Sequence, residues 1–319
     1  MLAQFLLQFL VQGLLCMKLG ISVTSAYRVD NPRDGARCMI ERARAAANAN
    51  FDSLFLGDHH ATREPYYQNV PMLGRMLAEW SDAVAGVLCL LPLWHPVLLA
   101  EQVATLACMH RGRFVLQCGI GRDEAQFAAM GANIKHRPSA FEESLAALRA
   151  LWAGETVTLD HRFDATAARI APLPPEPIEV WIGASARAAI ERAARLGDAW
   201  LADPGMTVEM AAERIGIYRE MCAKHRRVPN TIAIRRDVYV GASHANAQRD
   251  MASVLAKGYR GFDPGALVIG DEASVAAQFV ALAELGFDHV LVRNISPDQR
   301  LALSTIERLG RVREQLATV

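Results

Sequence analysis

Short apolar runs alternate along most of the chain with longer segments whose apolar positions recur at helical spacing. Eight of the runs are predicted as strands: KLGISVT, DSLFLG, AVAGVLCLL, RFVLQCG, IEVWIG, AWLA, IAIRRDVYV and HVLVRN. Most are continuously apolar rather than alternating with polar residues, which is typical of parallel strands covered on both faces. The pattern therefore predicts strands in the interior with helices on the outside.

Helical spacing is clearest at 99–106 and 275–285, where apolar residues fall three or four positions apart. Three strands follow a helical segment directly, through a residue that tolerates a left-handed backbone: Asn50, Gly197 and Gly286. Such a residue is typical of a tight connection from a helix to a strand. We expect each of the eight strands to be followed by a helix.

Eight alternating units in one chain predict a single (β/α)8 TIM barrel over residues 17–319. A doubly wound open sheet is the alternative arrangement of the same units. Two segments interrupt the alternation, at 153–177 and at 258–270, and both are rich in proline or glycine. We interpret them as excursions from the barrel rather than domain boundaries, and the apolar segment 1–16 as an N-terminal extension whose place in the mature protein is uncertain.

Composition narrows the possible partners. The chain of 319 residues is 52% hydrophobic and has a formal net charge of zero, without a basic block. This argues against a nucleic-acid partner. After residue 16 no segment is long and apolar enough to predict a membrane span. The six cysteines are scattered without a paired motif, which favours reduced thiols in the cytoplasm and disfavours a metal site.

In a barrel of this kind the active site lies at the carboxyl ends of the strands. The second strand ends at Asp58-His59-His60, an abrupt change from apolar to titratable residues. Adjacent strand residues point to opposite sides, so His59 and His60 are poorly placed to bind one metal ion. No spaced histidine or cysteine motif supports a metal site either, and we predict none. A phosphoesterase is disfavoured because its partner Asp-x-Asp motif is absent.

Gly183, Ala184 and Ser185 lie between the fifth predicted strand and the helix after it. Small residues there let backbone amides approach a phosphate, and a helix N-terminus favours negative charge. Ser185 is the expected N-cap residue of the helix and would also donate to a phosphate. Alternatively, Ser185 is a plain N-cap without a ligand.

Three longer segments together resemble the luciferase-like monooxygenase family, which includes bacterial luciferase and deazaflavin F420-dependent reductases. They are GDHH at 57–60, LLPLWHPVLLAEQVATLACMHRGRFVLQCGIGRDEAQFAAMG at 90–131 and PPEPIEVWIGASARAAIERAARLGDAWLA at 174–202. The resemblance runs from about residue 18 to the C-terminal helix. It implies a (β/α)8 barrel that binds a reduced flavin, FMN or F420, at its C-terminal face.

The resemblance also implies roles for residues. His59 would be the general base or hydrogen-bond donor beside the flavin, and Gly183, Ala184 and Ser185 would hold the flavin phosphate. Further cofactor-binding residues would be Leu90, Gln117, Cys118 and Gly119, and the substrate pocket would contain Asp58, His60, Tyr66, Tyr67 and Trp94. Gly119 stands where luciferase carries a reactive cysteine, with Cys118 just before it. This departure argues against light emission.

We expect a flavin-dependent oxidoreductase, with a monooxygenase that uses reduced FMN and oxygen on a small organic substrate favoured. An F420-dependent hydride-transfer enzyme on the same fold is the first alternative, and a non-enzymatic flavin-binding protein is the second. A flavin reductase is a possible partner of an FMN enzyme. The resemblance further implies a homodimer, for which the helical segments 71–80 and 97–110 would supply the surface.

Overall fold

The computed structural model describes residues 17–317, and the predicted extension 1–16 lies outside the described residues. Parallel strands form a sheet that closes on itself, because β8 pairs with β9. In barrel order the strands are β1 (Lys18–Val23), β2 (Ser53–Leu56), β3 (Val84–Leu90), β4 (Phe114–Gly119), β7 (Glu179–Ala184), β8 (Ala199–Ala202), β9 (Thr231–Val240) and β11 (His289–Asn294). These are the eight predicted strands, and the (β/α)8 barrel is confirmed.

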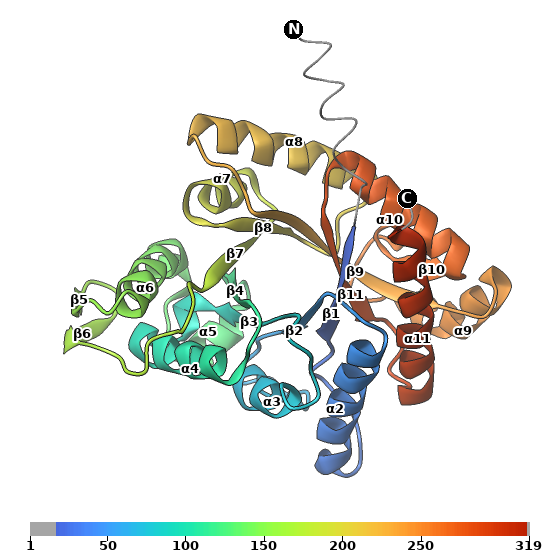
Figure 1. Cartoon of the computed structure of the whole chain (residues 1–319), viewed down its shortest axis with the longest axis horizontal. Helices are drawn as coiled ribbons and strands as arrows, with labels where there is room; N and C mark the ends of the chain where they lie inside the picture. The colour runs from blue at the N-terminus through green and yellow to red at the C-terminus, as the bar shows by residue number, and fades with distance from the viewer. Residues whose placement is uncertain (1–16, 318–319) are drawn as a thin grey trace, which may run out of the picture.

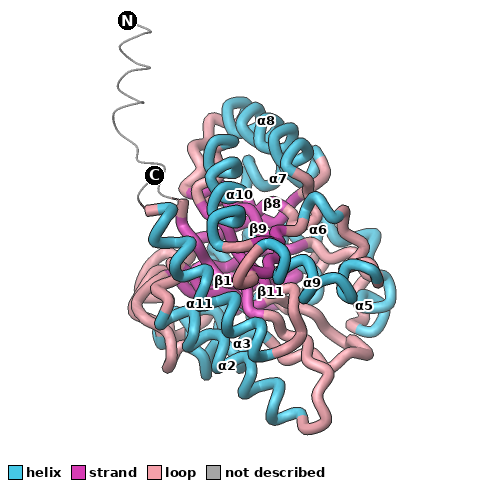
Figure 2. Tube along the Cα trace, turned by 90° about the vertical axis from the view of Figure 1, so that its right-hand side faces the viewer, coloured by secondary structure: helices cyan, strands magenta, loops and turns pink. Residues whose placement is uncertain are grey.

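Helices follow the barrel strands and surround them as a ring (Figure 1), so that the strands are enclosed when the molecule is turned (Figure 2). The main ones are α2 (Pro32–Asn48), α3 (Asn69–Met76), α4 (Pro96–Met109), α6 (Arg137–Trp152), α7 (Arg187–Leu196), α8 (Val208–Lys224), α10 (Glu272–Leu285) and α11 (Gln299–Leu316). Within residues 17–317, no helix combines the length and apolar composition that a membrane crossing requires.

Both predicted excursions are present, and each contains structure that the apolar pattern did not indicate. The first holds an antiparallel hairpin of β5 (Val157–Asp160) and β6 (Asp164–Ala168) beside α6, at the edge of the molecule (Figure 1). The second follows α9 (His244–Ala256) and contains the short strand β10 (Val268–Gly270), which pairs with β9 outside the barrel. A further short helix, α5 (Glu124–Ala129), follows β4.

The core has two layers because alternate strand residues point into the barrel or out toward the helices. The inner layer is small and includes Phe55, Val115, Trp181, Leu201 and Leu291. Trp181 therefore points into the barrel, where its ring lies 5.4 Å from that of Phe55. The larger outer layer packs the strands against the helices. This two-residue periodicity fixes which side chains face the mouth of the barrel.

Two of the three predicted helix-to-strand breaks are left-handed. Asn50 has φ 55° and Gly286 has φ 102°, whereas Gly197 is extended, with φ −84°. Gly197 stands between α7 and β8 as predicted, but the physical reason for a glycine there is space rather than a left-handed backbone. A Cβ atom on Gly197 would lie 2.8 Å from the Ala193 carbonyl oxygen and 2.9 Å from that of Ala199.

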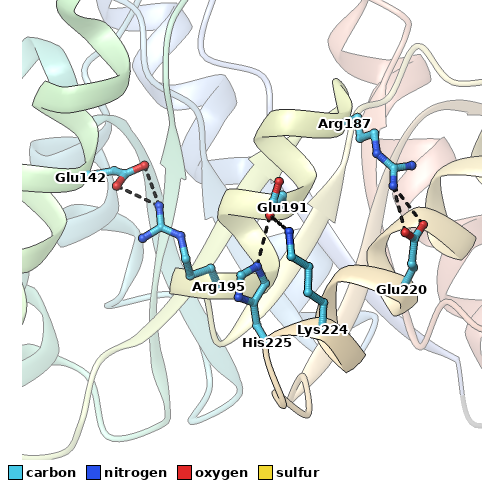
Figure 3. A network of polar contacts seen from close by, with 7 residues as sticks. All are labelled: Glu142, Arg187, Glu191, Arg195, Glu220, Lys224 and His225. Atoms are coloured by element: carbon cyan, nitrogen blue, oxygen red, sulfur yellow. Dashed lines mark hydrogen bonds and ion pairs between the residues drawn. The ribbon is translucent and has the colours of Figure 1, made fainter.

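Helix α7, which begins near the predicted phosphate site, is joined to its neighbours by ion pairs on the surface (Figure 3). Arg195 pairs with Glu142 of α6, and Arg187 pairs with Glu220 of α8, each at 2.9 Å. Lys224 of α8 also pairs with α7 through Glu191. Exposed pairs contribute only about 0–1 kcal/mol each. These ion pairs help to orient α7 between α6 and α8.

Glycine in the barrel wall provides a stability test. A Cβ on Gly86 would lie 2.0 Å from the Val115 carbonyl oxygen and 2.9 Å from the Phe55 ring. Gly86→Ala should therefore lower the free energy of unfolding by at least about 1–3 kcal/mol. Gly216 is exposed within α8 with open space around it, so Gly216→Ala should raise that free energy by up to about 1 kcal/mol. Urea unfolding of both variants measures the difference, and equal stability would contradict the described packing.

Candidate active site at the barrel mouth

Polar side chains face the barrel interior on both sides of the apolar layer: Ser53 and His289 bond each other at 2.9 Å near the amino ends of the strands, and a larger set lies toward the carboxyl ends. Ala233 and Leu291 belong to the inner apolar layer, so Arg235 and Arg293, each two residues further along, also face the interior. By the same periodicity Gln117 of β4 follows Val115. The candidate site is built above the apolar layer from these positions and from the segment after β2.

Asp58 organises the segment after β2. The carboxylate is 4% exposed, and its Oδ2 accepts hydrogen bonds from the Leu90 amide at 2.8 Å and from Trp94 Nε1 at 2.9 Å. Its Oδ1 lies 3.1 Å from His60 Nε2, a close ion-pair distance without hydrogen-bond alignment. Asp58 thus joins the ends of β2 and β3 and orients Trp94 and His60, rather than opening to a substrate itself.

The His59 ring contacts a side chain from α5. Gln126 Nε2 lies 3.0 Å from His59 Nδ1 and also 3.0 Å from the His60 carbonyl oxygen. A carbonyl oxygen only accepts, so the Gln126 atom facing it must be the NH₂ group, and its second proton points to His59. His59 Nδ1 is then the acceptor. In the neutral ring the proton is on Nε2, which makes His59 a hydrogen-bond donor through that atom.

His59 lies at the exposed side of the site, next to Tyr66. Their rings meet edge to face at 5.5 Å, and Tyr66 reaches over Gly57. Burial of the ring by surrounding protein lowers the pKa of His59 below its ordinary value, and the nearby Arg293 and Arg260 lower it further despite Asp58. These effects favour the neutral ring, which agrees with the Gln126 contact.

Not all predicted cofactor residues share one face. Leu90, Gln117 and Gly119 lie on interior positions, and a Cβ on Gly119 would come within 2.8 Å of the Leu90 side chain. Gln117 is 3% exposed, and its Nε2 has no hydrogen-bond partner. Cys118 points the other way, into the outer core, where burial raises the pKa of its thiol. The structure does not bring Cys118 together with the others.

The start of α7 has the character of an anion site. The N-cap residue is Ala186 rather than the expected Ser185, and no side chain caps the first amides of the helix. The physical reason is that β7 extends to Ala184 and the helix begins only at Arg187, so Ser185 stays in the exposed turn. A Cβ on Gly183 would meet only the Cys118 carbonyl oxygen, at 3.5 Å. Free amides at a helix N-terminus and this open glycine fit a phosphate.

The remaining predicted pocket residues, Tyr67 and Trp94, lie in different surroundings. Tyr67 turns away from His59, since its ring packs beside Tyr27 and its hydroxyl donates to the Pro32 carbonyl oxygen. Trp94 has its ring edge against His60 at 5.3 Å and also lines a cavity of about 420 Å³. Other residues lining that cavity are Leu93, His95, Met130, His136 and Phe163. Trp94 is placed to form a wall of a site, and Tyr67 is not.

Sequence reasoning missed Gln126 and a charged cluster of Arg235, Asp237, Arg260 and Arg293. Arg260 Nη1 lies 2.8 Å from Asp237 Oδ2, and Arg235 Nε lies 3.5 Å from Asp237 Oδ1. The signal was available, because IAIRRDVYV places charges within an otherwise apolar strand. Across the part of the chain that the structure describes, no group of three His, Cys, Asp or Glu side chains is placed to hold a metal ion.

Known proteins resemble this chain both in sequence and in fold. The model of the luciferase-like monooxygenase family matches residues 17–267, most of the chain. An F420-dependent glucose-6-phosphate dehydrogenase of Beutenbergia cavernae is 30% identical over 201 residues. The matched part spans 59% of this chain and 59% of that relative.

Solved structures share the fold over nearly the whole chain. Monooxygenase RslO1 from Streptomyces bottropensis has a TM-score of 0.79 at 19% identity, covering 92% of this chain and 98% of its own. The oxygenating constituent of 3,6-diketocamphane monooxygenase from Pseudomonas putida, solved with FMN, has a TM-score of 0.77 at 16% identity, covering 93% and 97%. With the family model matched from the first strand to beyond β9, the chain belongs to the luciferase-like monooxygenase family of oxidoreductases.

Proposed function

We propose that this protein is a flavin-dependent oxidoreductase whose cofactor lies across the barrel mouth, with its phosphate end at the start of α7. The proposal rests on two sets of hydrogen-bonding groups at the carboxyl ends of the strands that lack partners. Gln117 Nε2 is a buried donor without a partner, and the first amides of α7 have no cap. A buried unpaired donor costs about 1–3 kcal/mol, so a ligand that accepts from it is favoured.

The residues present fit a flavin in other respects. Leu90 and Gly119 offer an apolar surface beside Gln117, which suits a flat ring system with polar edges. His59 would donate from Nε2 to the cofactor or to a substrate oxygen, while Gln126 holds its other nitrogen. When bound, the cofactor supplies the redox chemistry, either as hydride transfer or as oxygen activation. The chain's own part is to orient both reactants and to donate this hydrogen bond.

The choice between F420 and FMN rests on the relatives. The curated relative from Beutenbergia cavernae is named for F420, and further relatives at 25–30% identity have the same name. The neighbour solved with FMN is 16% identical and resembles this chain in fold alone. This favours F420-dependent hydride transfer, reversing the preference for FMN and oxygen drawn from sequence. The FMN monooxygenase remains the second candidate, because RslO1 and the diketocamphane enzyme share the fold.

Capping α7 tests the phosphate site directly. In Ala186→Asp, the new carboxylate should bond the first amides of the helix and raise the free energy of unfolding by about 0.5–2 kcal/mol. It should also repel and displace a phosphate, weakening flavin binding by about 10- to 100-fold. Ala186→Gly leaves the amides free and is the control. Unchanged flavin affinity in the stabilised Asp variant would show that the flavin phosphate does not bind at the start of α7.

His59 is tested by truncation. His59→Ala should lower kcat by about 10²–10³-fold, the usual effect of losing a preorganised donor, with little change in flavin affinity. The matched control is His225→Ala, since His225 is the C-cap residue of α8, and the helices of such a barrel run back to the amino ends of its strands. Steady-state kinetics with a flavin titration separates the two effects. Full turnover in His59→Ala would end its catalytic assignment.

The tautomer of His59 is tested through Gln126. In Gln126→Glu, a carboxylate replaces the NH₂ donor, so Nδ1 must carry the proton and the pKa of His59 should rise above its ordinary value. Two-dimensional proton–nitrogen NMR of the histidine ring as a function of pH reports both changes. Gln68→Leu is the control, because Gln68 donates to the His59 carbonyl oxygen and not to the ring. An unmoved pKa and tautomer in Gln126→Glu would refute the contact.

A further inference from the structure

Three neighbouring strands of the barrel place charges toward its mouth. Arg235 and Asp237 of β9 and Arg293 of β11 occupy interior positions, and Asp237 and Arg293 are register partners in adjacent strands. Arg260 joins them from the excursion after α9 and packs over the Phe262 ring at 4.8 Å. Asp203 directly follows the adjacent strand β8, and its Oδ1 accepts from the Gly205 amide.

The charges in this cluster do not balance. Three guanidinium groups, Arg235, Arg260 and Arg293, lie around the Asp237 carboxylate, and Asp203 is a second carboxylate near Arg235 and Arg260. Asp237 is fully buried and is already paired with Arg260 at 2.8 Å and with Arg235 at 3.5 Å. The Nε atoms of Arg235 and Arg293 are buried without a hydrogen-bond partner. A guanidinium only donates, so the cluster presents unmet donors, and its three positive charges exceed the one carboxylate that pairs with them.

We propose that Arg235 and Arg293, backed by the Arg260–Asp237 pair, form a subsite for an anionic group of the substrate: a carboxylate, sulfonate or phosphate. Such groups offer several acceptor oxygens in the plane or fork that guanidinium donors match. The inference rests on the proposed function in naming this ligand as the substrate. It goes beyond that function by naming the substrate's chemical class.

The substrate is a more suitable ligand for this subsite than the cofactor. The phosphate end of the flavin is proposed at α7, which follows β7, whereas the arginines stand on β9 and β11, beyond β8. Arg293 and Arg260 lie close enough to His59 to affect its titration, and Arg293 and Arg235 close enough to affect Tyr66. An anion held between them would therefore put the rest of a small substrate beside His59, where the reaction is proposed.

Calorimetric binding with matched ligand pairs tests the subsite. The probes are inorganic phosphate, sulfate, glucose 6-phosphate against glucose, and benzoate against benzyl alcohol, each with the full-length protein. Arg235→Met and Arg293→Met should weaken the binding of the anionic probes by about 10- to 100-fold, the effect of losing charged hydrogen bonds. Arg235→Lys retains the charge and should lose less affinity for these probes. It also serves as a second variant if the Met variant misfolds. Arg44→Met, a surface arginine paired with Glu79, is the matched control and should not change binding.

The outcomes separate this proposal from the proposed function. Anion binding that depends on Arg235 and Arg293, with flavin affinity unchanged in the variants, supports it. Such binding in a protein that takes up no flavin would support the subsite and overturn the proposed function. Three results overturn the subsite: no anionic probe binds at millimolar concentration, neutral partners bind equally well, or the Met variants bind anions as the wild type does. Equal loss of flavin affinity in the variants would assign the arginines to the cofactor instead.

Discussion

Closure of the sheet between β8 and β9 is the constraint on which the rest of this molecule depends. A closed barrel has one interior, and alternate residues of each strand must fill it. Phe55, Val115, Trp181 and Leu291 occupy that space as an apolar layer. Below this layer the buried pair of Ser53 and His289 fills the amino end of the interior. The charged and amide-bearing residues from β4, β9 and β11 converge above the layer because they occupy the interior positions nearest the carboxyl ends of their strands.

Two contacts then turn the mouth from a surface into an organised site. The buried Asp58 carboxylate joins the ends of β2 and β3 and holds Trp94 and His60. Gln126, from a six-residue helix, fixes both the His60 carbonyl oxygen and the ring of His59. The adjacent histidines thus have different tasks. His60 pairs with Asp58 inside the protein, and His59 is left neutral with one nitrogen free to donate.

Much of the fold was predictable because the barrel strands are short apolar runs between helices of regular spacing. The β5–β6 hairpin was not, since its residues are mostly polar or small and exposed, so burial leaves no pattern in them. Within the site, Asp58 and His59 were found because they end a strand abruptly. Gln126 could not be found, because its function arises from a contact with His59, 67 residues away in the sequence. Cys118 was grouped with Gly119, and Tyr67 with Tyr66, but their side chains point elsewhere. A segment can match a motif while adjacent residues in it face opposite sides.

An anaerobic titration of the purified protein with reduced F420 and, separately, with reduced FMN, followed by admission of air, tests whether the barrel mouth binds a flavin. We expect saturable binding of one cofactor at one site per chain, with F420 preferred and no rapid reaction with oxygen. Tighter binding of FMN with fast oxygen consumption would favour the monooxygenase. Binding of neither cofactor would contradict the claim that the barrel mouth is a flavin site.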